Sequence, residues 1–160
     1  MSFNEGSQWA INHLYGITKY PDDADHTTYF KSLLLCAAGD GVLAPEERAW
    51  VVGLAATIAG EKYTEMVKNY AADEDLLQVL QQNSRIDSSA RHVMLYDAIR
   101  ASGADGAISD GERERIQKMA NFMDVTKETV AELEKLYNEE TAQSKKRREL
   151  LFPANSPWHS

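Results

Sequence analysis

The stretch AAGDGVLAPEER, residues 37–48, places an Asp-Gly pair a few residues before a proline and two glutamates. Glycine after aspartate is typical of a tight turn, and Pro45 suits the first position of a helix. Glu46 and Glu47 then fall in the first helical turn, where carboxylates complement the helix dipole. The stretch therefore predicts a short loop that joins two helices.

A related stretch, SGADGAISDGER at residues 102–113, follows 65 residues later and aligns Asp40 with Asp105 and Glu47 with Glu112. The match continues into flanking apolar positions at helical spacing. Val51, Leu54, Ala55 and Ile58 align with Ile116, Met119, Ala120 and Met123, and Phe30, Leu33 and Leu34 align with Leu95, Ala98 and Ile99. We expect two helix-loop-helix repeats, about 26–60 and 88–125, that bury these stripes against one another with approximate twofold symmetry.

Helical periodicity extends over nearly the whole chain, whereas alternating strand patterns are almost absent. The sequence predicts helices at residues 5–19, 26–38, 45–59, 64–72, 74–82, 88–102, 110–123 and 127–151. With 160 residues, 43% of them hydrophobic and 26% charged, the chain suits one globular domain over 1–160. We therefore expect an all-α, compact bundle of seven or eight helices, with a long C-terminal helix and tail at 127–160.

The charge balance and the absence of several motifs restrict the function. Acidic residues outnumber basic ones 25 to 17, which disfavours a nucleic-acid partner. The polar N-terminus does not resemble a signal peptide, the single cysteine cannot form an internal disulfide, and the apolar stretch 49–60 is too short to span a bilayer. We expect a cytoplasmic protein that is not itself transmembrane. The sequence has no phosphate-binding loop, dinucleotide turn or nucleophile elbow, and we do not expect an enzyme.

The two loops match the second part of a calcium-binding loop, which has Asp before Gly and Glu at its last position. The residues that supply oxygen atoms in this interpretation are Asp40, Glu47, Asp105 and Glu112 by their carboxylates, and Val42 and Ala107 by their backbone carbonyls. The earlier ligand positions hold Cys36, Ala38, Ala101 and Gly103, which supply no side-chain oxygen, so a standard calcium hand is not expected. Oxygen ligands alone favour Ca²⁺ or Mg²⁺.

The same acids also have a purely structural interpretation. Ser109 and Glu112 have the spacing of a capping box, in which each side chain bonds the backbone amide of the other residue. Ala44 cannot cap in this way, but Pro45 and the glutamates after it still favour a helix start. The metal site and the well-capped turn both remain open from residue chemistry.

AAGDGVLAPEERAWVVGLA at 37–55 and ASGADGAISDGERERIQKMA at 101–120, with a two-helix insert between them, resemble the TerB-like tellurite-resistance family over about 27–125. The resemblance implies a fold of seven or more helices and a cytoplasmic role in responses to tellurite and other stress. It also implies work alongside membrane and other tellurite-resistance proteins, and no enzymatic reaction. Carried onto this chain, the family's proposed divalent-cation ligands are Asp40, Glu47, Asp105 and Glu112.

Two functional hypotheses follow. In the first, the chain is a non-enzymatic stress-response protein that binds a divalent cation through its paired acidic loops. In the alternative, it is a metal-independent interaction module that docks a protein partner through its acidic face and C-terminal helix.

Overall fold

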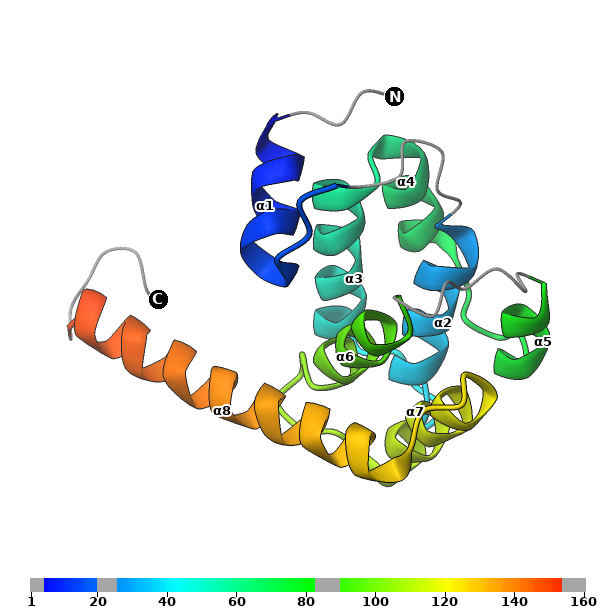
Figure 1. The fold of residues 1–160 in the computed structure, drawn as a ribbon. Coiled ribbons are helices and arrows are strands. Elements are labelled where there is room, and N and C mark those ends of the chain that lie inside the picture. The colour runs from blue at the N-terminus through cyan, green and yellow to red at the C-terminus, as the bar shows by residue number, and fades with distance from the viewer. Residues whose placement is uncertain (1–4, 20–25, 83–89, 154–160) are drawn as a thin grey trace.

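The computed structural model describes residues 5–19, 26–82 and 90–153, and all the regular elements in these ranges are helices (Figure 1). They are α1 (Glu5–Tyr15), α2 (Thr27–Ala37), α3 (Pro45–Ile58), α4 (Glu61–Asn69), α5 (Leu76–Gln81), α6 (Arg91–Ser102), α7 (Asp110–Phe122) and α8 (Lys127–Leu151). The prediction of an all-helical chain with seven or eight helices is confirmed. The tail residues 154–160 lie outside the described ranges.

Helix α2 is the central element, and it packs against α3, α4, α5, α6 and α7. In Figure 1 it lies between α3 and α5. Eight of its eleven residues are buried, which is expected because its sequence TTYFKSLLLCA is apolar on almost every side. The apolar positions that the two sequence copies share are all buried, as predicted. They lie on α2, α3, α6 and α7, and the last of them, Met123, directly follows α7. Cys36 is also fully buried and acts as a small core residue.

Several predicted helix ends were wrong because local caps were not recognised. Helix α1 ends at Tyr15 rather than at residue 19, since Gly16 takes a φ of +68° and its amide bonds the Asn12 carbonyl. Helix α4 starts at Glu61 rather than at 64, because Gly60 (φ +83°) ends the preceding segment, and it stops at Asn69 rather than at 72. Helix α5 starts at Leu76 rather than at 74, because the Asp75 carboxylate accepts the Gln78 amide and caps it. Helix α6 is described from Arg91, and most of its predicted first turn, 88–89, lies outside the described ranges.

Arginines from neighbouring helices bond the C-terminal carbonyls of three helices. Arg48 of α3 donates to the carbonyls of Val67 (2.8 Å) and Tyr70 (2.9 Å) at the end of α4. Arg115 of α7 donates to a carbonyl in the last turn of α2, and Arg91 of α6 to the carbonyl that follows α7. A guanidinium at this position satisfies carbonyls that lack a partner within the helix and complements the negative end of the helix dipole. These bonds orient α4 and α7 relative to the core.

A buried carboxylate on α6 holds α1 and α2 together. Asp97 accepts hydrogen bonds from the hydroxyl of Tyr15 on α1 (2.9 Å) and from that of Tyr29 on α2 (2.5 Å). Arg100, 3.7 Å from this carboxylate, lies over the ring of Trp50 on α3. Burial raises the pKa of Asp97 to about 6, although the Tyr29 hydroxyl, the charge of Arg100 and the Tyr15 hydroxyl all favour the ionised form.

The long helix α8 runs along one edge of the molecule, from beside α7 to beyond α6 (Figure 1). It contributes buried Val130 and half-buried Leu133 and Tyr137 near its start, whereas the residues after Ser144 are exposed. None of the described helices is both long and apolar enough to cross a membrane.

Asp97→Asn should change how stability depends on pH. In the wild type, the folded pKa of about 6 lies above the ordinary value of 3.8. The stabilisation that this group gives the folded state is therefore fully present below pH 3.8 and is lost as the pH rises through 6. The free energy of unfolding falls by on the order of 3 kcal/mol over this range. Asparagine does not titrate. Between pH 4 and pH 7 the free energy of unfolding of the variant should therefore rise by about 3 kcal/mol relative to that of the wild type.

Chemical denaturation at several pH values measures this difference. Asp73→Asn, on the surface, is the matched control and should follow the wild-type profile. A difference between Asp97→Asn and the wild type that stays constant with pH would contradict the assignment.

Candidate functional site at the paired loops

Loop 1 (residues 38–44) and loop 2 (residues 103–109) form the same turn. In loop 1 a carboxylate oxygen of Asp40 accepts the Val42 amide (2.9 Å), and in loop 2 one of Asp105 accepts the Ala107 amide (3.1 Å). Between these partners Gly41 (φ +95°) and Gly106 (φ +111°) adopt conformations that a side chain would strain. The Asp-Gly pairs therefore close the loops, as the structural interpretation predicts.

The two glutamates cap the helices that follow the loops. Glu47 accepts the Ala44 amide (2.7 Å), and Glu112 accepts the Ser109 amide (2.6 Å). In the second copy Ser109 returns the bond by accepting the Glu112 amide (3.2 Å), which completes the predicted capping box. Pro45 is the first residue of α3, also as predicted.

Capping alone does not require burial, yet both glutamates are only 2% exposed. Their carboxyl groups come together between the two loops. Burial raises the pKa of Glu47 to about 8 against the opposing effect of the Ala44 amide, and a hydrogen bond and the charge of Glu112 raise it further, followed by the charge of Asp105. The buried pair therefore keeps a proton to a higher pH than an exposed glutamate does. Such a pair can exchange that proton for another cation.

The two carboxyls meet because the backbones of loop 1 and of the α7 start are in direct contact. A Cβ atom added at Gly39 would lie 2.5 Å from both the Cα and the N of Glu112. Gly111, on the other side of the contact, faces the Gly39 carbonyl equally closely. Only glycine permits this approach, which brings Glu112 towards loop 1 and Glu47.

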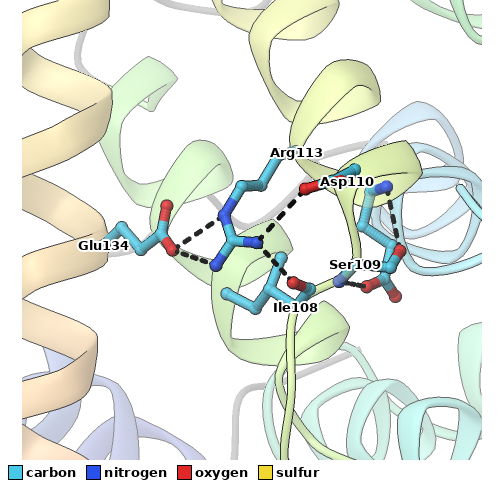
Figure 2. A network of polar contacts seen from close by, with 6 residues as sticks. Ile108, Ser109, Asp110, Arg113 and Glu134 are labelled. Carbon is cyan, nitrogen blue, oxygen red and sulfur yellow. Dashed lines mark hydrogen bonds and ion pairs between the residues drawn. The ribbon is translucent and has the colours of Figure 1, made fainter.

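Helix α8 supports loop 2 through contacts that the sequence did not predict. Arg113 donates to the Glu134 carboxylate of α8 (2.7 Å) and to the Ile108 carbonyl of the loop (2.5 Å), as Figure 2 shows. The Tyr137 hydroxyl of α8 donates to the Gly103 carbonyl at the start of the loop (2.8 Å). Glu134 and Tyr137 each lie more than twenty residues along the chain from the residue that they bond, and the local sequence pattern contains no signal for these two contacts.

The six predicted ligand residues separate into two groups. Glu47 and Glu112 are brought together and buried, and Asp105 lies close enough for its charge to act on Glu47. Asp40, Asp105, Val42 and Ala107 are exposed, and one oxygen of each aspartate is already used in its own turn. Within the described ranges, no three His, Cys, Asp or Glu side chains are arranged to hold a metal ion. The two carboxyls of the glutamate pair are oxygen donors of the kind that hard cations prefer.

No family model and no curated protein matches the chain. Among solved structures, the crystal structure of a tellurite resistance protein from Nostoc punctiforme PCC 73102 matches with a TM-score of 0.79 and 39% sequence identity. The match covers 95% of this chain and 95% of that chain. That protein is named for tellurite resistance and not for a catalytic activity, and the expectation that this chain is not an enzyme stays a prediction.

Gly39→Ala should lower the free energy of unfolding by about 2 kcal/mol or more, because the new Cβ meets backbone atoms that cannot rotate away. Gly53→Ala is the matched control, since a Cβ there meets nothing within 4 Å and the residue lies inside α3. We expect the control to raise stability by about 0.5–1 kcal/mol, as is usual for glycine to alanine in a helix. Urea denaturation of both variants checks this, and equal effects at the two positions would argue against a close contact of the loops.

Proposed function

Because the chain belongs to the TerB-like tellurite-resistance family, we propose that it acts in responses to tellurite and related stress by binding a divalent cation, Ca²⁺ or Mg²⁺, between its two loops. One observation carries this proposal, the shared burial of Glu47 and Glu112 at the contact of loop 1 with α7. We propose no catalytic role.

Two acids buried side by side are costly unless something neutralises them. A proton shared by the pair can do so, and burial together with the neighbouring Glu112 raises the pKa of Glu47 for this reason. A bound divalent cation would supply two positive charges to the same carboxyls, and it would also offset the nearby charge of Asp105. Carboxylate ligands favour hard ions such as Ca²⁺ and Mg²⁺ over soft metals.

The proposed ligands are Glu47 and Glu112 at the centre, with Asp105 next to them and Asp40 at the edge. One oxygen of each aspartate closes its turn, which leaves the other oxygen to face a ligand. The carbonyls of Val42 and Ala107, together with water, would complete the ~6–8 oxygens of Ca²⁺ or the ~6 of Mg²⁺. The loops must shift to gather these atoms, so we expect modest affinity. We further propose that the two helix-loop-helix units are pseudo-symmetric repeats that place the loops together.

The alternative function is metal-independent docking of a protein partner through the acidic loops and α8. It is supported by the fact that each of the four acids already accepts a backbone amide, so the loops are closed without an ion. In both cases the bonds from Arg113 and Tyr137 link loop 2 to α8. We propose that partners, including other tellurite-resistance proteins and a membrane component, bind the surface that loop 2 and α8 form together.

Replacing the pair by Glu47→Gln with Glu112→Gln should abolish any heat of Ca²⁺ or Mg²⁺ binding in calorimetry and any rise of Tm with added cation. With chelator present and at pH above 8, the same variant should be more stable than the wild type, because no charge is left to bury. Glu128→Gln with Glu132→Gln removes the same charge from the exposed surface of α8 and should leave the cation response intact. A wild type without a cation response would favour the alternative.

The aspartates should not contribute equally. Asp105 acts on Glu47 electrostatically, so Asp105→Asn should weaken cation binding more than Asp40→Asn, by roughly several-fold to tenfold for the loss of one charged ligand. Equal losses, or a larger loss for Asp40→Asn, would contradict the proposed order of ligands. Circular dichroism should confirm unchanged helix content in both variants.

A further inference from the structure

The last two turns of α8 extend away from the rest of the protein. The last described hydrogen bonds of this helix with the bundle are those of Tyr137 with Gly103 and of Glu140 with Tyr96. Ser144 is half-buried, and the residues from 145 to 152 are exposed. At 1.5 Å per residue, the helix projects roughly 10 Å further between Ser144 and Leu151. Figure 1 places this end at the edge of the molecule, beyond α6.

This projecting end carries a ring of positive charges followed by two exposed leucines. Lys145, Lys146, Arg147 and Arg148 are consecutive, so at about 100° per residue they point in four directions around the helix axis. Within the described part of the chain, no ion pair is formed by any of them. Beyond the ring and the exposed Glu149, Leu150 and Leu151 are 74% and 64% exposed. We call the four cations and the two leucines the α8 tip.

We propose that the α8 tip docks end-on onto an anionic lipid surface. A helix that lies flat on a membrane needs one apolar side and one polar side. The α8 tip does not have that pattern, because its cations point in every direction. A planar bilayer entered end-on surrounds the tip with phosphate groups on all sides, while the two leucines reach the acyl boundary.

The chemistry of the tip favours lipid over other anionic partners. Each cation near an anionic membrane contributes about 1 kcal/mol, and the two exposed leucines add apolar burial. Nucleic acid would bind the four cations but would leave the leucines in water. The whole chain carries −8 even with these cations included, so the acidic body is repelled from an anionic surface and contact is confined to the tip. This inference does not depend on cation binding at the loops.

Co-sedimentation of the full chain with vesicles tests the proposal. The wild type should bind vesicles of phosphatidylcholine mixed with phosphatidylglycerol, and it should not bind phosphatidylcholine alone. Changing all four cations of the tip to Gln should lower binding by at least about tenfold. The matched control changes Lys62, Lys68, Lys118 and Lys135 to Gln, which alters the net charge equally at exposed lysines elsewhere, and it should bind like the wild type. Free inorganic phosphate should not displace the protein from the vesicles.

The double variant Leu150→Ser with Leu151→Ser distinguishes a lipid partner from a purely electrostatic one, because it removes apolar surface and leaves every charge in place. We expect this variant to lose about tenfold or more in vesicle binding and to keep wild-type retention on heparin, a polyanion without an apolar phase. Three outcomes would overturn the proposal. The first is no binding to anionic vesicles, and the second is equal loss in the α8 tip variant and the lysine control. The third is unchanged vesicle binding in the leucine variant, which would indicate a purely electrostatic partner such as nucleic acid.

Discussion

The contact on which this structure depends is the backbone-to-backbone approach of loop 1 and the start of α7. Gly39 and Gly111 face each other there without side chains. That approach buries the two capping glutamates against each other, and burial raises the pKa of Glu47. Each glutamate makes an ordinary capping interaction within its own helix-loop-helix unit. The contact between the two units turns these two glutamates into a buried acidic pair. The cost of two neighbouring buried acids is a physical reason to expect a cation or proton between them.

The other constraints extend outward from this contact. Helix α8 is joined to loop 2 directly by Tyr137, and by Glu134 through Arg113 of α7, which also bonds the Ile108 carbonyl of the loop. The α8 tip lies at the far end of the same helix. A cation site at the loops and a docking surface at the tip would therefore share one rigid element, and each can be tested without the other. On the opposite side, Asp97 links α1 to the core through tyrosine hydroxyls.

The resemblance to the tellurite-resistance family rested on the doubled loop motif, and the solved relative supports it over nearly the whole chain. The motif succeeded because an Asp-Gly turn followed by a capping glutamate is local chemistry that occurs twice. The helix ends were less well predicted. Gly16 and Gly60 end segments through positive φ values, and apolar periodicity alone does not reveal such values. The α5 start depended on which of several acids caps the helix, and Asp75 was the one that did.

The amino-acid sequence by itself determined the helices, the two turns and the buried stripes, because spacing, turn chemistry and capping act over a few residues. It also identified the acids at the loops. Only the tertiary structure decided which acids meet: Glu47 and Glu112 are buried together, whereas Asp40 and Asp105 remain exposed. It also decided that Arg113 and Tyr137 connect loop 2 with α8. Such pairings join residues far apart in the chain, and their geometry depends on how whole helices pack.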